Sequence, residues 1–427
     1  MTHYTESYWG LPQSCRLWGV PHTDTGIAET KVIDIYPQSS LESSDAISFT
    51  IPPIENCMLE KVHILTTLKV VQADGENLAA DTNVSTIPYL AAGIWRNVEF
   101  SIGGVSLTQS FDNAYAMTQF WQTVLHTPDS CHFLKNHTEG LQLDNVTTKT
   151  GSESLVFYNG AVVNSNAKER ADRIRGSNSV DLISELNVSI LKQDKLLPPA
   201  IEYHVNLTKN HSEFILLEAN NGTSKVVYEK VLLRCTFKRP ADHALQGILK
   251  ELSSSPGQYI ADKTRVTFIS IPNAIDHTVD LFKGILPYCF IIGVQDRSAL
   301  MRTRNKNPFS LHPIKKVQLY TNGSEHFPRP IERTLSEYGM MYHTFLDEVG
   351  YPNKGDTLIH AHYDCYPAMV FALTPNKNIN NTLNLTQQGT CRLSLELFNE
   401  AQNYVLMVIA FYEQIVEISK DGEVTFS

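Results

Sequence analysis

One series of strand, glycine turn and helix occurs twice in this chain, and this repeat constrains the fold more than any other feature. The first copy has a strand-like run at 98–102, the turn pair Gly103-Gly104, a short continuation at 105–107 and then an amphipathic helix. About 220 residues later the same order returns, with a strand at 317–320, the turn signal Asn322-Gly323 and a second helix.

Both helices space their apolar residues identically, at i, i+3, i+4, i+7 and i+8, which places them on one face. Asp112 is the expected N-cap of the first helix. Thr334 and Glu337 form the expected capping box of the second. The apolar positions are Met117, Phe120, Trp121, Val124 and Leu125 in the first helix and Tyr338, Met341, Tyr342, Phe345 and Leu346 in the second.

The segments that follow each helix also match. After the first helix, 201–207 alternates apolar and polar residues, and 226–237 has the composition of a strand. After the second, 391–397 alternates in the same way and leads into the apolar run 404–412. We interpret this recurrence as one β-rich unit present twice. Further strands are expected at 31–36, 46–51, 58–71, 182–191, 265–271, 288–294, 315–320, 368–373 and 424–426.

A chain of 427 residues is longer than one hydrophobic core usually supports, so two domains are expected. A helix predicted at 241–252 and the breaker Ser253-Ser-Ser-Pro-Gly257 mark the boundary. The predicted order is an N-terminal arm at 1–30, a first jelly roll at 31–240, a helical connector at 241–257 and a second jelly roll at 258–427. The fold class is mainly all-β, with two tandem jelly-roll β-sandwiches and a prominent helix in a connection of each.

Two features qualify this division. A polar stretch of about fifty residues, 127–178, follows the first helix and is predicted to be a functional excursion. A pair of immunoglobulin-like sandwiches is the structural alternative, but the helix within each unit and the lack of a Cys-Trp-Cys pattern disfavour it.

Composition and termini narrow the functional classes. A formal charge of −10 and a pI near 5.8 argue against general nucleic-acid binding over the whole surface. The first residues lack a signal-peptide pattern, and apolar runs of about ten residues are too short for a transmembrane helix. The seven scattered cysteines without CxxC spacing predict free thiols in a reducing compartment. We therefore expect a product that is not secreted and has no transmembrane segment.

Signs of catalysis are weak. His360-Ala-His362 has the spacing that begins a cupin metal site, but the Glu and the distant third His of such a site are missing, so both are expected to be ordinary side chains. Cys365 beside Asp364 completes no Cys/His zinc spacing. No P-loop, GxGxxG after a strand, HExxH, GxSxG or paired-carboxylate motif occurs. We assign no catalytic, cofactor-binding or metal residue and expect no enzyme.

Two clusters of basic residues are candidates for contacts with DNA. The first alternates with Glu169 and Asp172 and is expected to be a solvated, salt-bridged loop; it comprises Lys168, Arg170, Arg173 and Arg175. The second is more uniformly positive and could contact packaged DNA by attraction to phosphate, if it faces the interior of a shell. It comprises Arg302, Arg304, Lys306, Lys315 and Lys316.

Short sequence segments spread over roughly residues 30–427 resemble those of a known family. They are IYPQSSL at 35–41, ISFTI at 47–51, EFSIGG at 99–104, DKLLPP at 194–199, FALTP at 371–375, QGTCRLSL at 388–395, VIA at 408–410 and IVEI at 415–418. In these segments the chain resembles the major capsid proteins of polinton (Maverick) elements and adintoviruses. The connecting helix after Pro240 also stands where that family has a helix between its two barrels.

This resemblance implies a double jelly-roll major capsid protein, of the lineage that includes adenovirus hexon. Three chains would form a pseudo-hexagonal homotrimeric capsomer that tiles an icosahedral shell. The implied partners are other copies of the chain, penton and minor capsid proteins, and packaged DNA through interior basic loops. The implied location is the virion, assembled inside the host cell.

Two other functions remain open at this level. One is a carbohydrate-binding module of two jelly rolls, in which loop aromatics hold sugars: Tyr4, Tyr8 and Trp9, or Tyr363 and Tyr366. The other is a host-domesticated protein derived from a capsid gene, which the sequence alone does not separate from an active virus.

Overall fold

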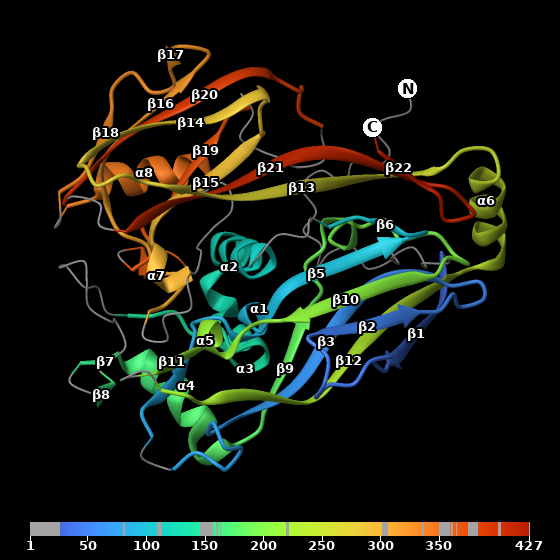
Figure 1. Cartoon of the computed structure of the whole chain (residues 1–427). Coiled ribbons are helices and arrows are strands. Elements are labelled where there is room, and N and C mark those ends of the chain that lie inside the picture. The colour runs from blue at the N-terminus through green and yellow to red at the C-terminus, as the bar shows by residue number, and fades with distance from the viewer. Residues whose placement is uncertain are drawn as a thin grey trace, which may run out of the picture.

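The computed structural model describes residues 26–79, 82–108, 113–145, 157–158, 161–162, 164–218, 222–300, 306–334, 337–349, 359, 362–363, 365–374, 383–399 and 403–426. Figure 1 shows two β-rich halves, the first from blue to green and the second from yellow to red, with helix α2 (Ala114–His126) between them. Helix α6 (Asp242–Leu252) joins the halves at one end, close to the 241–252 expected from the sequence.

The first half contains two four-stranded antiparallel sheets. One has the order β1-β12-β3-β9 and the other β2-β10-β5-β6. The strands of the first sheet are β1 (Ile27–Ile35), β12 (Lys225–Pro240), β3 (Met58–Val71) and β9 (Val180–Glu185). Those of the second are β2 (Ala46–Ile51), β10 (Tyr203–Lys209), β5 (Trp95–Ile102) and β6 (Val105–Ser106). Small pairs join β4 (Val84–Thr86) to β11 (Leu216–Glu218) and β7 (Phe157–Tyr158) to β8 (Ala161–Val162).

The second half also contains two sheets, with the orders β13-β21-β15-β19 and β14-β20-β16-β17; β22 adds to β21, and β18 adds to β16. The first sheet is built from β13 (Gly257–Ser270), β21 (Tyr404–Ile418), β15 (Cys289–Asp296), β19 (Met369–Ala372) and β22 (Val424–Phe426). The second is built from β14 (Asp276–Ile285), β20 (Gln388–Leu397), β16 (Ile314–Thr321), β17 (Ser324–Glu325) and β18 (Ile331–Glu332).

The two halves connect their strands in the same way. The order β1-β12-β3-β9 of the first half corresponds strand by strand to β13-β21-β15-β19 of the second. In the same way, β2-β10-β5-β6 corresponds to β14-β20-β16-β17. In both halves the glycine hairpin joins the last two strands of the second sheet, β5 to β6 and β16 to β17. This is the strand order of a jelly roll. The predicted fold of two tandem jelly rolls is therefore confirmed.

The repeated turn has the same backbone in both halves. Gly103 and Gly104 have φ angles of 56° and 79°, and Asn322 and Gly323 have φ angles of 53° and 80°. Each pair closes a two-residue hairpin, between β5 and β6 and between β16 and β17. Positive φ at both central residues is the requirement of a type I′ turn, which explains why glycine and asparagine occupy these positions.

The two repeated helices also occupy the same connection, but their first turns differ from expectation. Helix α2 begins at Ala114 with Asn113 at its N-cap and no side-chain capping hydrogen bond, and Asp112 lies outside the described residues. Helix α8 (Gly339–Glu348) has Tyr338 at its N-cap. Thr334 Oγ1 does accept the backbone N–H of Glu337, at 2.9 Å, but this bond closes a turn before the helix.

Several other elements differ from the expected boundaries. β1 begins at Ile27, within the segment expected to be an arm. The strand expected at 182–191 ends at Glu185, and a 3₁₀ turn covers Ser189–Leu191. The 127–178 stretch contains α3 (His132–Glu139) and α4 (Ser165–Ile174), flanked by 3₁₀ turns at Asp129–Cys131 and Arg175–Ser177. The remaining short helices are α1 (Leu90–Gly93), α5 (Ser212–Ile215) and α7 (Arg297–Leu300).

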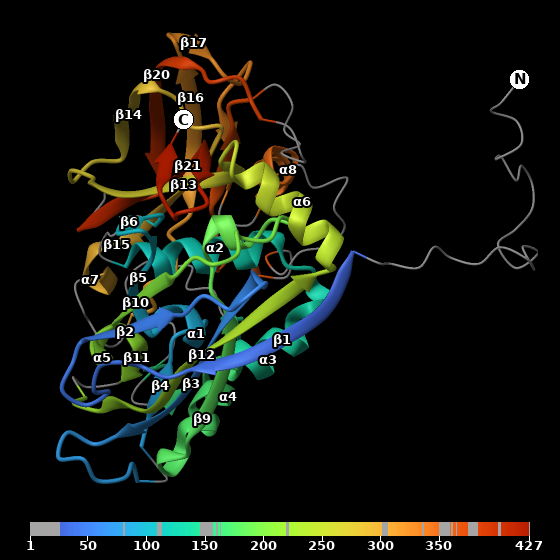
Figure 2. The same ribbon diagram turned by 90° about the vertical axis from the view of Figure 1, so that its right-hand side faces the viewer.

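The apolar interior forms three clusters. One fills the first sandwich and is completed at one end by four residues of the second half, and one fills the second sandwich. The third lies between the sandwiches around α2 and takes residues from both halves. β21 shows how the clusters are separated: Leu406 and Val408 point into the second sandwich, whereas Met407 and Ile409 point towards α2. Figure 2 shows α2 below β13 and above α1.

Candidate functional site at the contact between the two sandwiches

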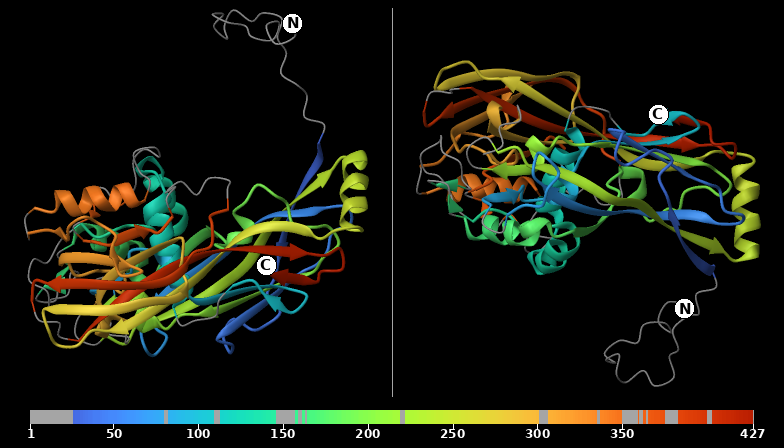
Figure 3. Two further views of the ribbon diagram at one scale, coloured as in Figure 1. Left: turned by 90° about the horizontal axis from the view of Figure 1, so that it is seen from above. Right: turned by 60° about the horizontal axis from the view of Figure 1, so that its bottom comes forward.

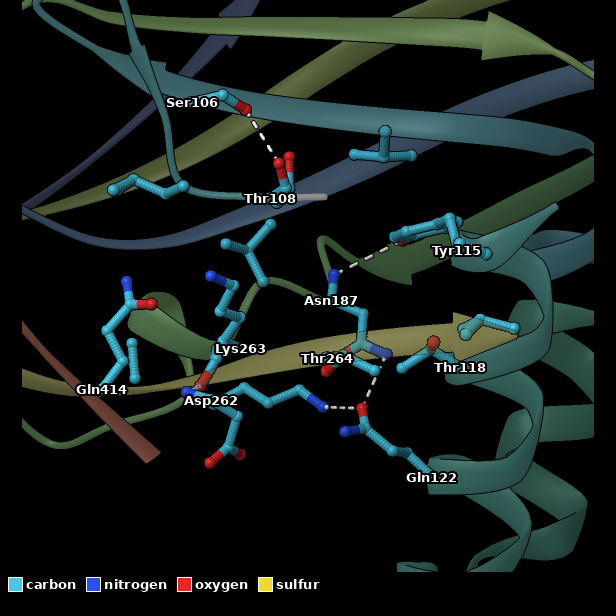
Figure 4. Close-up of a pocket in the computed structure, with 18 of the residues that line it drawn as sticks. Ser106, Thr108, Tyr115, Thr118, Gln122, Asn187, Asp262, Lys263, Thr264 and Gln414 are labelled. Atoms are coloured by element: carbon cyan, nitrogen blue, oxygen red, sulfur yellow. Dashed lines mark hydrogen bonds between the residues drawn. The ribbon is translucent and has the colours of Figure 1, made fainter. Parts of the chain in front are cut away.

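A groove of about 320 Å³ runs between the two halves. Figure 4 shows its walls: Thr118 and Gln122 project from α2, Asn187 comes from the loop after β9, and Asp262 and Lys263 belong to β13. A neighbouring cavity of about 340 Å³ continues along α2 towards α8. Both are lined by Gln122, so the groove follows the face of α2 that is turned to the second half.

Polar side chains line both walls of this groove. Gln122 Oε1 accepts hydrogen bonds from Asn187 Nδ2 at 3.1 Å and from Lys192 Nζ at 3.0 Å. Within the second half, the Tyr288 hydroxyl donates to Asp262 Oδ1 at 3.1 Å. The backbone N–H of Asp262 also donates to Ser189 Oγ at 2.6 Å, which ties β13 to the first half.

The groove changes the ionisation of two of these groups. Loss of hydration is the main cause that lowers the pKa of Lys192 to about 8, partly opposed by the charges of Glu185 and Asp262. Loss of hydration also raises the pKa of Asp262, against the hydrogen bond from Tyr288 and the charge of Lys192. Perturbed groups in a cleft mark a candidate site, but structural ion networks produce the same shifts.

A buried polar network, here called the Asp144 network, crosses the contact between the halves deeper in the molecule. Asp144 Oδ1 accepts Arg170 Nη2 at 2.7 Å, and Asp144 Oδ2 accepts Asn307 Nδ2 from the second half at 2.7 Å. The Tyr366 hydroxyl accepts the backbone N–H of Asp144 at 3.2 Å. The Arg170 and Asp144 side chains are only 2% and 1% exposed, so this ion pair is fully removed from water.

Arg170 is also bonded to backbone. Its Nε donates to Thr86 O at 2.7 Å, and its Nη1 donates to Gln142 O at 2.5 Å. A buried charge is tolerated only when it is paired and hydrogen-bonded, and this guanidinium meets that requirement. The network therefore holds three segments of the first half and two segments of the second in one arrangement.

Aromatic rings surround this network. Phe120 of α2 stacks on Phe309 of the second half with ring centroids 4.1 Å apart. Phe120 also lies 5.5 Å from the Tyr366 ring, and Trp121 lies 6.4 Å from the same ring. All four side chains are buried. Such contacts contribute packing energy and fixed geometry, so the site acts as a rigid joint between two sandwiches.

The first basic cluster differs from the solvated loop expected for it. Lys168, Arg170 and Arg173 lie on helix α4, and only Arg175 begins the turn after it. Arg170 is buried in the Asp144 network. Arg173 donates to Asn136 O at 2.7 Å, and Arg175 makes an exposed pair with Asp172 at 3.6 Å. The expectation was wrong for Arg170 because its partners come from distant segments.

The described members of the second basic cluster are each paired with an acid. Lys306 contacts Asp296, Lys315 contacts Glu396, and Lys316 lies 3.2 Å from Glu332. Arg302 and Arg304 lie outside the described residues. These pairs offset part of the positive charge that suggested a DNA contact, and that contact stays a prediction.

The histidine and cysteine residues that the structure describes do not form a metal site. His362 lies in a turn, with Nδ1 2.9 Å from Asp144 O, and burial lowers its pKa. His360 and Asp364 are outside the described residues, and Cys365 is buried. Among the residues described, no group of three or more His, Cys, Asp or Glu side chains is placed to hold a metal ion. No disulfide joins any of the six described cysteines.

Of the loop aromatics that are candidates for sugar binding, the two that the structure describes are buried. Tyr363 is 1% exposed and Tyr366 is 0% exposed, so neither ring can stack on a sugar. Tyr4, Tyr8 and Trp9 lie outside the described residues. In the part of the chain that is described, no helix combines the length and hydropathy needed to cross a membrane.

Comparisons with known proteins identify structural neighbours only. No family model matches the sequence, and no curated protein matches it either. Among solved structures, a chain of the Sputnik virophage has a TM-score of 0.65 at 12% identity, covering 98% of this chain and 92% of that one. The faustovirus major capsid protein has a TM-score of 0.62 at 10% identity, covering 94% and 93%. The mavirus major capsid protein has a TM-score of 0.56 at 13% identity, covering 100% and 95%. At these identities the likeness concerns the fold, which is that of double jelly-roll viral major capsid proteins.

Proposed function

We propose that this chain is a viral major capsid protein and forms the shell of a virion without chemistry of its own. The observation that carries the proposal is the pair of jelly rolls with one strand order, joined rigidly through α2 and the Asp144 network. Two major capsid proteins, of faustovirus and mavirus, share this fold over nearly the whole chain. A rigid pair of similar sandwiches is suited to a shell because it presents two similar flanks to its neighbours.

The proposed assembly is a homotrimer. Three chains with two jelly rolls each would give six similar walls and a pseudo-hexagonal capsomer, and such capsomers would tile an icosahedral shell. Penton and minor capsid proteins are further proposed partners. The polinton and adintovirus group is the proposed affiliation, based on the segments at 35–41, 99–104, 194–199 and 388–395.

Packaged DNA is a weaker proposed partner. The described lysines of the second basic cluster are paired with acids, so a contact would depend on the remaining charge and should weaken as salt is added. The proposed location is the virion, with assembly inside the host cell.

The assembly proposal is tested by measuring the mass and shape of the purified chain. Light scattering should give about 144 kDa, three times the 48.0 kDa chain, and negative-stain electron microscopy should show pseudo-hexagonal particles. A mass that stays at 48.0 kDa up to the concentrations used for assembly would contradict the trimer.

A further inference from the structure

The groove between the two halves and the neighbouring cavity together have the form of a binding site for an extended chain. We propose that they bind an extended peptide segment of another protein, with an acidic residue at the groove and a bulky apolar side chain in the neighbouring cavity. The proposal goes beyond the shell function, because the whole site lies within one chain and does not depend on the trimer.

The groove and the neighbouring cavity follow one face of α2 along the helix. The α2 residues that line them share this face because their spacing follows the helical repeat; they are Ala114, Tyr115, Thr118, Gln122, Leu125 and His126. From the first to the last of these the helix rises about 18 Å, at about 1.5 Å per residue. An extended peptide covers that length with about five residues.

The edges of two sheets border the groove. β6 ends the order β2-β10-β5-β6 and β13 begins the order β13-β21-β15-β19, so in the described part of the chain neither has a second neighbouring strand. Figure 4 shows Ser106 of β6 opposite Asp262 and Lys263 of β13. An edge strand presents backbone N–H and C=O groups, and an added extended chain can pair with them.

The register of β13 shows which backbone groups lie at its edge. The Asp262 N–H is directed away from β21, because it donates to Ser189 Oγ of the first half at 2.6 Å. In an antiparallel pair, every second residue directs its backbone groups to the same side of the strand. Thr264, two positions further and lining the groove, therefore presents its backbone at this edge.

Polar side chains of α2 are placed to bond a peptide backbone in the groove. Gln122 Oε1 is held by hydrogen bonds from Asn187 and Lys192, which leaves the Nε2 of the same amide as a donor. Thr118, one turn earlier on α2, adds a hydroxyl on the same wall (Figure 4). The wall therefore offers both donors and acceptors.

The neighbouring cavity is suited to one bulky apolar side chain. Its lining is mostly apolar, and the apolar residues are Leu125, Ile291, Val349, Val370, Ala372 and Phe411. The buried Glu348 carboxylate of α8 also lines it, and Oε2 already accepts the Ala372 N–H at 2.8 Å. Ligand pockets combine an apolar lining with a few polar groups in this way. Figure 3 shows α2 and α8, which both contribute to the cavity, in the part of the molecule away from α6.

The charges of the groove favour an acidic peptide. Lys263 is exposed on β13, and among the residues that the structure describes no carboxylate pairs with it. Lys192 remains mostly charged, because its pKa, lowered to about 8, is still above neutral pH. Asp262, the acid in the groove, already accepts the Tyr288 hydroxyl. A peptide carboxylate is therefore the group that these two lysines attract.

Peptide selection on the purified full chain tests the proposal. Random short peptides displayed on phage are selected on the wild type, and enriched peptides are synthesised with a fluorescent label. They should combine an acidic residue with a bulky apolar residue and should bind saturably in fluorescence polarisation. A selection without enrichment, or one that enriches basic peptides, overturns the proposal.

Two variants locate the binding. Lys263→Glu should weaken binding of the enriched peptide by at least about tenfold, because it replaces an attraction by a repulsion. Thr118→Trp should weaken it as strongly, because the indole fills the groove. The matched control is Lys283→Glu, which reverses an exposed lysine on β14, outside the groove, and should bind as the wild type does. If Thr118→Trp lowers the melting temperature, Lys263→Glu and its control decide.

Cys289 gives a readout at the cavity itself. It is half-buried and lines the cavity, whereas the equally half-buried Cys131 lies in the turn before α3. Bound peptide should slow alkylation of Cys289 by iodoacetamide and leave that of Cys131 unchanged, as measured by mass spectrometry. An unchanged rate at Cys289, or equal binding to Lys263→Glu, would show that the groove is not the site.

Two further outcomes are distinguishable. Enriched peptides that match this chain's own sequence would assign the site to a second copy and contradict the proposed partner. A wild type that stays monomeric would contradict the trimer, but peptide binding at the groove would still stand.

Discussion

At the scale of single residues, the Arg170–Asp144 pair is a buried ion pair, so the loss of either member should be costly. The guanidinium of Arg170 donates hydrogen bonds to Asp144 and to two backbone carbonyls in a buried site. Removing one member of a buried pair leaves the other charge desolvated, which costs far more than the pair itself contributes. The energetic role of Arg170 is therefore to make burial of Asp144 possible.

Arg170→Met should lower the free energy of unfolding by about 3–5 kcal/mol, because the Asp144 carboxylate then stays buried with Asn307 as its remaining side-chain donor. Urea denaturation followed by tryptophan fluorescence measures this, since Trp95 and Trp121 are both fully buried.

The matched control is Arg175→Met. Arg175 forms an exposed pair with Asp172, with side chains 61% and 50% exposed, so its loss should cost no more than about 1 kcal/mol. If both substitutions lowered the free energy of unfolding equally, the buried pair would contribute no more to stability than the exposed pair.

The sequence could not predict this network. Arg170 stands among alternating charges, which is the usual pattern of a solvated segment, and its acidic partner Asp144 is 26 positions away. Asn307 lies 163 positions from Asp144. The folding of the first half brings Arg170 to Asp144, and the packing of the two halves adds Asn307, so no local spacing in the sequence indicates the network.

At the scale of elements, the two glycine hairpins allow a comparison within one molecule. Gly104 and Gly323 occupy the second turn position at φ angles of 79° and 80°, and a Cβ on either would meet nothing within 4 Å. Gly103 has φ 56°, and a Cβ there would lie 2.5 Å from Gly422 O in the turn between β21 and β22. The first hairpin is thus packed against the second half of the chain.

Gly104→Ala and Gly323→Ala should each cost about 1–2 kcal/mol of stability, the cost of a left-handed backbone for an L-residue. Gly103→Ala should cost more, because the clash with a backbone carbonyl adds to the same strain. Urea unfolding of the three variants compares them directly. Equal costs at 103 and 104 would mean that the Gly422 turn yields without resistance.

Much of the fold at this scale was predictable. Apolar patterns and turn residues are local in sequence, and they predicted several elements closely. β2 and β3 match the predicted strands at both ends, and α6 differs from its predicted range by one residue. β14 was missed although His277, Val279 and Leu281 alternate along it, so a signal was present. α3 and α4 were missed because few of their residues are buried: Glu139 in α3, and Ala167, Arg170 and Ile174 in α4.

At the scale of the whole molecule, the cluster around α2 makes the two sandwiches energetically dependent on each other. Phe309 belongs to the second half, is fully buried, and stacks on Phe120 of the first. Phe371 is equally buried but belongs to the core of the second sandwich. Removing either ring leaves a cavity and lowers the free energy of unfolding by about 3–5 kcal/mol. The two cavities lie in different apolar clusters.

Phe309→Ala should therefore speed amide hydrogen exchange in β3 and β12 as well as in β15 and β21, because loosening the shared cluster exposes both halves to opening. Phe371→Ala is the matched control and should speed exchange mainly in β15, β19 and β21. Hydrogen-exchange mass spectrometry resolves these strands. If Phe309→Ala leaves exchange in β3 and β12 unchanged, the sandwiches open independently. The cluster around α2 then would not hold the two sandwiches as one unit, which the proposed shell function requires.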